Sequence, residues 1–293
     1  MASKRIVEKK LLFLFMLAGK AQKFVSVVVR SALVETLSTG DKECLIELVE
    51  ASKVMNQVWA HQMWQKGPEF LAQADSELDH ATALYKLIQI NRGPWSELDN
   101  FESFIPDSSL FMKIPNTAPP GGNFYPEDMT KDEFTTWINS SPIEKSSATD
   151  YYTFIRRDES GNLAIVPYST ELSNLLSICS AHLLKASSLC SSESLRNFLV
   201  SRAHAFSSND YYPSSLDWLK IDSPISVTIG ADFIYHDRLF GYKASYEAMI
   251  GLRDAVETEK LVSFVRFQLF IYRTMVECDP KQTARVGKQL TNG

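Results

Sequence analysis

Hydrophobic residues recur at helical spacing in the first third of the chain. Between residues 41 and 66 they fall every three or four positions, and Asp41 stands where an N-terminal cap is expected. Ser76-x-x-Asp79 has the spacing of a capping box, so a second helix is predicted to begin there and to end before Gly93-Pro94. This part of the chain is therefore predicted to be helical.

Proline changes the pattern in the next segment. Six of the twelve prolines fall between residues 106 and 142, where they remove backbone donors and disfavour long helices. The exception is Thr130-x-x-Glu133, a capping box that predicts a short helix. We expect an extended connector that contains this one helix.

The following segment has the pattern of a hairpin and two helices. Runs rich in β-forming residues at 151–155 and 163–166 flank a polar turn that contains glycine. Ser169 and Ser192 are each predicted to cap a helix, because leucines, alanines and phenylalanines follow them at helical spacing.

A strand is predicted later, at Ile225–Ile229, where β-branched residues alternate with smaller polar ones and Gly230 ends the run. From Glu247 onwards the pattern predicts a helix again. The fold class is therefore predicted to be α+β, mostly helical, with a small mixed or antiparallel β-sheet.

Charge excludes one class of partner. The net charge of -5 argues against a nucleic-acid-binding protein, which would normally carry a basic excess. The N-terminus differs, because residues 1–30 hold seven basic side chains and one acidic one. Within residues 1–21 a basic start precedes eight apolar residues, 11–18, which are too few to span a bilayer. We predict a cytoplasmic protein without a membrane span; a secretory signal is the alternative interpretation.

Catalytic motifs are absent from the sequence. The four cysteines are dispersed, no H-E-x-x-H pairs two of the five histidines, and no glycine-rich phosphate loop is present. His80 lies among acidic residues that more often complement a helix dipole than bind metal, and His236-Asp237 fits a polar turn better than an acid–base pair. Two aromatic pairs fit packing better than ligand stacking: Trp59 with Trp64, and Tyr211 with Tyr212. We predict no catalytic residues, no metal ligands and no cofactor site.

Several stretches, taken together, resemble a known family. They are Glu43–Met55, Gly122–Met129, Tyr151–Asp158, Ser208–Tyr212, Val227–Gly230 and Leu239–Lys243. In this order they resemble the C-terminal region of plant proteins that join a Nudix hydrolase domain to a dipeptidyl-peptidase-III-like domain. The resemblance divides the chain into a divergent basic and apolar segment (1–29), a dipeptidyl-peptidase-III-like lobe (30–260), and a divergent C-terminal helix and tail (261–293).

The resemblance implies a chemistry whose motifs this sequence lacks. Dipeptidyl peptidase III releases dipeptides with a zinc ion held on an H-E-x-x-G-H helix, and neither that motif nor a Nudix box occurs in the 293 residues. The region covered corresponds to the lobe that faces the zinc lobe across the cleft. We therefore expect a truncated member of this hydrolase family that is inactive alone, or alternatively a non-catalytic peptide-binding or scaffold module.

The resemblance also implies one binding site. In the family, the strand that matches Val227–Gly230 lies along the cleft and pairs with an extended peptide, which makes Thr228, Ile229 and Gly230 candidate substrate-binding residues. Asp232 could then meet the amine of the peptide. The same strand could equally be an ordinary core strand, because β-branched residues suit both roles. Peptides are the expected partners, with self-association through an exposed lobe face as a second expectation.

Overall fold

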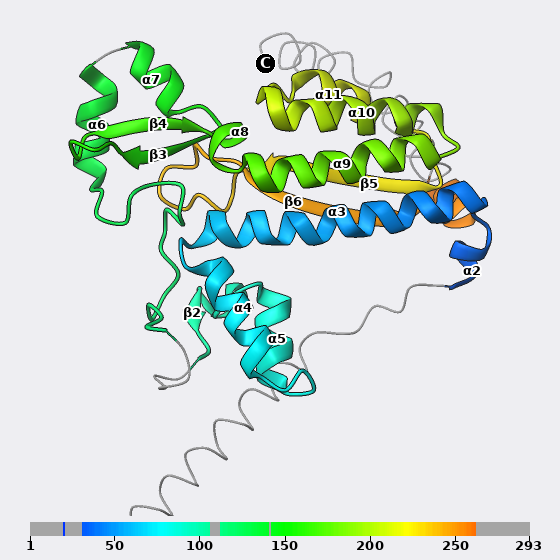
Figure 1. Ribbon diagram of the computed structural model, residues 1–293, viewed down its shortest axis with the longest axis horizontal. Helices are drawn as coiled ribbons and strands as arrows, with labels where there is room; N and C mark the ends of the chain where they lie inside the picture. Colours follow the sequence, from blue (N-terminus) through cyan, green and yellow to red (C-terminus); the bar gives the residue numbers. More distant parts are fainter. Residues whose placement is uncertain (1–19, 21–30, 106–111, 141, 262–293) are drawn as a thin grey trace, which may run out of the picture.

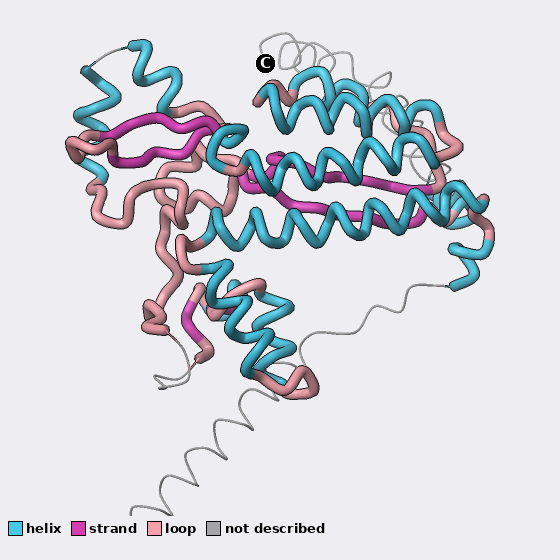
Figure 2. The backbone as a smooth tube through the Cα atoms, in the orientation of Figure 1, coloured by secondary structure: helices cyan, strands magenta, loops and turns pink. Residues whose placement is uncertain are grey.

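The computed structural model describes residues 20, 31–105, 112–140 and 142–261. The predictions for the N-terminal apolar run and for the C-terminal tail lie outside these residues. Across the described part of the chain, no helix is long and apolar enough to cross a membrane. Helices account for most of this part and the strands are few (Figure 2), which confirms the predicted α+β, mostly helical fold.

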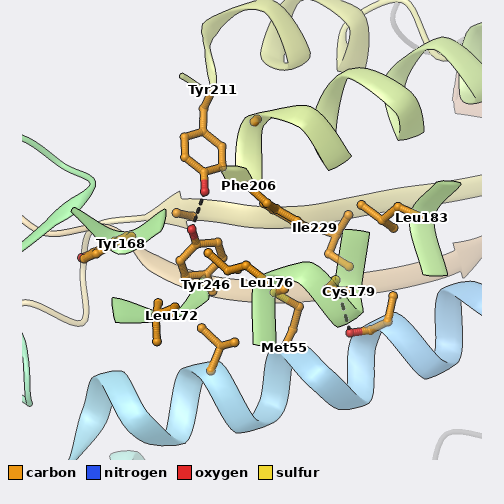
Figure 3. Packing of buried hydrophobic residues seen from close by; sticks show 14 of the residues in the cluster. Met55, Tyr168, Leu172, Leu176, Cys179, Leu183, Phe206, Tyr211, Ile229 and Tyr246 are labelled. Carbon is orange, nitrogen blue, oxygen red and sulfur yellow. Dashed lines mark hydrogen bonds between the residues drawn. The ribbon is translucent and has the colours of Figure 1, made fainter. Parts of the chain in front are cut away.

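Three long helices form the main layer of the molecule. They are α3 (Thr39–Met63), α9 (Ser173–Leu189) and α10 (Glu193–Ser208), and α9 packs against both of the others (Figure 1). The short helix α2 (Ser31–Glu35) precedes this layer, and α11 (Tyr212–Trp218) packs on α10. Leu176 and Cys179 of α9 belong to the core seen in Figure 3, where the hydroxyls of Tyr211 and Tyr246 also meet.

A long antiparallel hairpin packs on this layer. Strand β5 (Ile225–Phe233) pairs with β6 (Ser245–Leu252) in a register that sets Thr228 opposite Met249. Ile225, Val227 and Ile229 alternate onto the buried face, as the sequence predicts. Gln62 of α3 ties the hairpin to the helices, because its side chain donates to the carbonyl of Ala244 and accepts from the N–H of Tyr246.

A second hairpin lies at one end of the main layer. Strands β3 (Thr153–Arg157) and β4 (Leu163–Pro167) pair antiparallel, as predicted, and α8 (Tyr168–Glu171) follows them. Helices α6 (Lys131–Ser140) and α7 (Pro142–Ala148) accompany this hairpin (Figure 1). The N–H of Glu133 donates to Thr130 Oγ1 at 3.1 Å, which confirms the predicted cap.

A smaller hydrophobic core lies beyond the C-terminal end of α3. It is built from α4 (Gly67–Glu77), α5 (Ala83–Asn91), and the short strands β1 (Trp95–Ser96) and β2 (Glu102–Ser103), which flank the 3₁₀ turn η1 (Glu97–Asp99). Trp64 and Trp95 pack edge to face in this core. Packing, rather than ligand stacking, therefore explains the burial of Trp64.

Three predicted helix starts are wrong, and each has a local reason. The cap of α3 is Ser38, and Asp41 instead accepts two hydrogen bonds from Ser191, tying α3 to the turn between α9 and α10. Ser76 lies in the last turn of α4, and α5 is capped by Thr82. Ser169 lies inside α8, which begins one residue earlier.

The C-terminal strands also differ from the prediction. Strand β5 continues past Gly230 to Phe233, with an irregularity in register between Ala231 and Phe233. Glu247 lies in β6 rather than in a helix, and helical residues begin only at 255. Tyr246, Ala248, Ile250 and Leu252 alternate onto the face that packs on the core, whereas Met249 lies on the other face, so the side chains follow the period of a strand.

Candidate functional site

The β5–β6 hairpin presents one face to solvent. Residues paired across the strands point to the same face, so Ser226, Thr228 and Gly230 share it with Gly251, Met249 and Glu247. Ser226 is exposed, Thr228 is half-buried, and Met249 is 51% exposed. We call this surface the open face. The structure therefore places the side chain of Thr228 on the open face, whereas Gly230 is buried at one end of this face and Ile229 lies in the core.

Backbone hydrogen bonds define which groups of β5 face its free edge. The carbonyl of Pro224 accepts from the N–H of Arg253 beside β6, whereas the carbonyl of Val227 accepts from Nε1 of Trp218, on the other side. Because successive residues of a strand direct their backbone groups to opposite edges, Val227 and Ile229 face away from β6, and Thr228 and Gly230 face towards it. Only Ile229 among the three predicted binding residues therefore directs its backbone to the free edge.

Side chains cover this edge. The Trp218 indole donates to the Val227 carbonyl at 2.9 Å, and Ile229 is fully buried. Covering a strand edge prevents unwanted pairing with other chains. A peptide could pair with β5 here only after the Trp218 side chain moves.

Gly230 lies directly against the side chain of Arg202. Its φ is +145°, and a Cβ at this position would lie 2.3 Å from Nη1 of Arg202. Arg202, on α10, is only 2% exposed and donates through Nη1 to both carboxylate oxygens of Asp232. The carboxylate of Asp232, predicted to meet an amine, is therefore paired with a guanidinium.

A charged cluster lies at the Glu247 end of the open face. His236 is buried, and Nδ1 lies 2.6 Å from Oγ of Ser245, which itself donates to the Phe233 carbonyl, so Nδ1–H is the donor to Ser245. Nε2 of His236 faces Oε1 of Glu247 at 3.4 Å and Oε1 of Glu97 at 3.7 Å. The nearby His236 side chain lowers the pKa of the Glu97 carboxyl below its usual value. His236 thus links the smaller core to the hairpin.

Asp237 forms the polar turn that the sequence predicts. Its carboxylate accepts from four backbone N–H groups between residues 239 and 243 and from the hydroxyl of Tyr125. These bonds fix the loop that connects β5 to β6. Of the predicted alternatives for His236-Asp237, the turn is confirmed.

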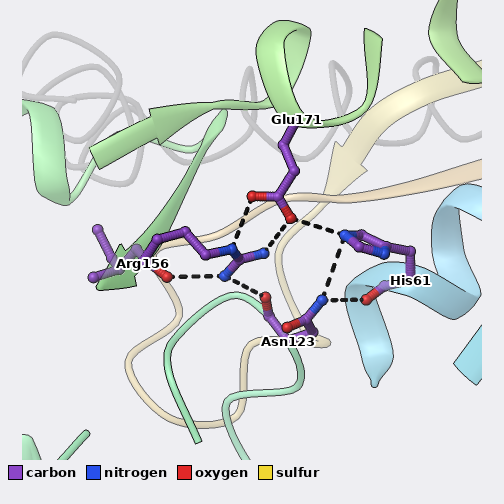
Figure 4. Close-up of polar contacts among 5 residues, drawn as sticks. His61, Asn123, Arg156 and Glu171 are labelled. Atoms are coloured by element: carbon purple, nitrogen blue, oxygen red, sulfur yellow. Dashed lines mark hydrogen bonds and ion pairs between the residues drawn. The ribbon is translucent and has the colours of Figure 1, made fainter. Parts of the chain in front are cut away.

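A second polar cluster joins four separate segments (Figure 4). Arg156 of β3 binds the carboxylate of Glu171 through Nε at 2.8 Å and Nη2 at 2.5 Å, and its Nη1 donates to the carbonyl of Asn123. His61 of α3 contacts Glu171 at 2.8 Å. Burial opposes ionisation of Glu171, but the bonds from His61 and Arg156 outweigh it and lower the pKa of this carboxyl. No nucleophile is part of this cluster, so its contacts support a structural junction between α3, β3 and α8.

The remaining candidates from the sequence are structural. His80 stacks on Tyr85 and contacts the carbonyl of Asp75. Cys44, Cys179 and Cys190 are buried free thiols. Tyr211 is buried, whereas Tyr212 is 72% exposed.

The described residues do not fit a zinc ion. Across residues 31–105, 112–140 and 142–261, no three or more His, Cys, Asp or Glu side chains are placed to hold a metal. Two of the carboxylates that contact histidines are also paired with cations: Glu171 pairs with Arg156, and Glu47, the partner of His182, pairs with Lys185.

Sequence reasoning missed Arg202, Trp218 and Gln62. Each lies on a helix whose periodicity gives no information about a partner far along the chain, and their partners lie in β5 or in β6. A weak signal exists for Arg202, which occupies the apolar side of α10 between Leu199 and Ala203. A buried arginine needs a partner, so this position could have indicated an ion pair.

Comparisons with known proteins agree with this architecture. No family model matches the sequence. The chain is 35% identical to Nudix hydrolase 3 of Arabidopsis thaliana, over 85% of this chain and 38% of the relative. The structure matches that of dipeptidyl peptidase III from Caldithrix abyssi with a TM-score of 0.74 and 33% identity, over 84% of this chain and 46% of the other. The enzyme from Corallococcus sp. strain EGB gives 0.72 and 36%, over 82% and 43%.

The mostly helical fold with small antiparallel sheets is that of the corresponding part of dipeptidyl peptidase III. By sequence and by fold, the chain is a relative of Nudix hydrolase 3 and of dipeptidyl peptidase III. It spans less than half the length of each of these relatives.

Proposed function

We propose that this chain is the peptide-binding lobe of a dipeptidyl-peptidase-III-like hydrolase, and that an extended peptide binds along β5. The observation that carries the proposal is the edge of β5 that faces away from β6. There the Val227 carbonyl accepts a hydrogen bond from the Trp218 side chain and from no backbone group of the described residues. Peptides that add a strand to a sheet edge use such backbone groups for affinity, and pockets beside the edge give selectivity.

The proposal assigns separate roles to the three candidate residues. Ile229 provides the backbone N–H and C=O at the free edge. Thr228 contributes its side chain to the open face, next to Trp218. Gly230 leaves room for Arg202, which supports the strand from α10. The Trp218 indole acts as a removable cap on the edge.

Calorimetry with an extended peptide tests this proposal. We expect the wild-type chain to bind weakly. Trp218→Phe keeps an aromatic ring but removes the N–H donor, so the Val227 carbonyl becomes available and the peptide should bind about tenfold more tightly. The control is the same peptide N-methylated at alternate residues, which removes backbone donors without altering the protein. Absence of binding to both wild-type and Trp218→Phe chains at millimolar peptide would refute the proposal.

We also propose that this chain alone does not release dipeptides. The sequence lacks H-E-x-x-G-H, and the described residues do not fit zinc. The scaffold role without peptide binding is the alternative, and the same calorimetric experiment separates the two.

A further inference from the structure

Arg202 has an unfilled hydrogen-bonding edge. A guanidinium presents Nε and Nη2 side by side, in the geometry that matches the two oxygens of a carboxylate. In Arg202 the Nε has no partner although it is buried, and Asp232 contacts only Nη1. Of the residues that the structure describes, none accepts a hydrogen bond from Nη2. A buried donor without an acceptor destabilises the folded state, so a ligand that accepts hydrogen bonds from Nε and Nη2 would be stabilising.

Arg156 shows the same edge when it is filled. There, Nε and Nη2 bind the two oxygens of Glu171, while Nη1 donates to backbone carbonyls. Arg157 shows that one guanidinium can serve two carboxylates, because it binds Asp128 through Nε and Glu133 through Nη1 and Nη2. The Asp232 contact therefore leaves Arg202 able to bind a second carboxylate.

A surface pocket lies beside this arginine. It is lined by Arg202, Ser215, Trp218, Thr228, Asp232 and Phe233. The lining combines two hydroxyl groups, two aromatic rings and the paired guanidinium. Trp218 and Phe233 place apolar surface beside the ion pair, and a hydrogen bond to a charged group is stronger next to apolar surface than in open solvent.

We infer that this pocket binds a carboxylate, which Arg202 receives through its Nε and Nη2 edge while Asp232 remains on Nη1. A planar, singly charged acid fits better than a phosphate, because the Asp232 carboxylate already neutralises the arginine and repels a dianion. The carboxylate can come from a free small acid or from an acidic residue of a peptide bound along β5. Only the second source rests on the proposed function.

Calorimetry on the full chain with N-acetylglutamate and N-acetylglutamine tests the pocket without any peptide. In both probes the α-carboxylate is blocked as the methylamide, so that the side chain of N-acetylglutamate carries the single carboxylate of the pair. These probes differ only in the terminal carboxylate, and we expect the acid to bind at least about tenfold more tightly than the amide. A second arm uses two extended peptides that differ by one Glu and one Gln. Binding of the acidic peptide but not of N-acetylglutamate identifies a peptide as the source, and the reverse identifies a free acid.

Two variants give opposite expected changes. Asp232→Asn keeps the shape of the side chain and removes the competing charge, so affinity for N-acetylglutamate should rise several-fold. Arg202→Lys removes the paired Nε and Nη2 donors of the guanidinium and should abolish the preference for acid over amide. Asp222→Asn, at an 87% exposed carboxylate outside the pocket, is the charge-matched control and should change nothing.

The inference fails if neither wild-type nor Asp232→Asn chain distinguishes the acid from the amide, whether free or in the peptide. Should Arg202→Lys prevent folding, Asp232→Asn still decides, since it leaves Arg202 in place. Peptides that bind equally well with Glu and Gln would leave the proposed function intact while refuting the carboxylate pocket.

Discussion

Gly230 illustrates how one missing side chain shapes the site. The sequence indicates a strand that ends at this glycine, whereas the strand continues and the glycine accommodates Arg202. The physical reason is a positive φ combined with a guanidinium at the position where Cβ would lie.

Gly230→Ala should lower the free energy of unfolding by about 2–5 kcal/mol, because backbone strain adds to a clash with Arg202. Gly161→Ala is the matched control: its φ is also positive, at +83°, but no atom lies within 4 Å of the added Cβ. This control should cost only about 1–2 kcal/mol. Urea denaturation measures both, and equal losses would contradict the role of Arg202.

Lys243 is a buried cation whose protonation should affect stability. Its ammonium is fully buried and donates to the carbonyls of Ala148 and Asp150 and to Oγ1 of Thr153. Burial lowers the pKa of Lys243 from 10.5 to about 7, and the nearby Asp150 and Asp237 only partly oppose this shift.

The sign of the pH dependence follows from proton binding. Between pH 7 and 10.5 the unfolded chain holds the Lys243 proton and the folded chain has released it. The contribution of Lys243 to stability therefore rises with pH in this window, by up to about 1.4 kcal/mol per pH unit. Denaturation of wild-type and Lys243→Met chains at several pH values should show the difference in unfolding free energy shifting in favour of wild type as pH rises. A difference independent of pH would contradict this prediction.

At the scale of elements, a buried amide is one of the groups that attach the hairpin to the helical layer. The buried Gln62 side chain satisfies Ala244 and Tyr246 at the outer edge of β6, in the manner of a neighbouring strand. This attachment matters because an isolated two-stranded hairpin is at best marginally stable.

Gln62→Leu should cost about 2–4 kcal/mol, because it orphans one buried N–H and one buried carbonyl. Gln57→Leu, at an exposed position of the same helix, should change stability by less than about 0.5 kcal/mol. Hydrogen exchange at Tyr246 provides the local measurement. Unchanged protection of this amide in Gln62→Leu would show that the hairpin does not depend on the contact.

For the whole molecule, the similarity to hydrolases and the absence of their zinc motif from the sequence lead to different expectations about activity. The family relation is to hydrolases. We nevertheless expect purified chain to contain no stoichiometric zinc and to release no dipeptides from a peptide substrate. Elemental analysis and a dipeptide-release assay check this. One zinc per chain that is lost on chelation, together with activity, would contradict it.

Local sequence patterns determined much of the secondary structure. Thr130 and Ser192 cap helices where predicted, and the β3–β4 hairpin forms at the predicted turn, because caps and turns depend on residues three to five positions apart. The buried alternation of Ile225, Val227 and Ile229 was also readable, since a strand places successive side chains on opposite faces.

Tertiary structure decided the site itself. That Trp218 covers the edge of β5, that Arg202 fills the space above Gly230, and that His236 faces Glu97 and Glu247 all depend on contacts between residues far apart in the chain. The same dependence explains why the residues from Glu247 to Leu252, predicted to begin a helix, lie in strand β6. Periodicity records which face of an element is buried, but only packing determines what covers that face.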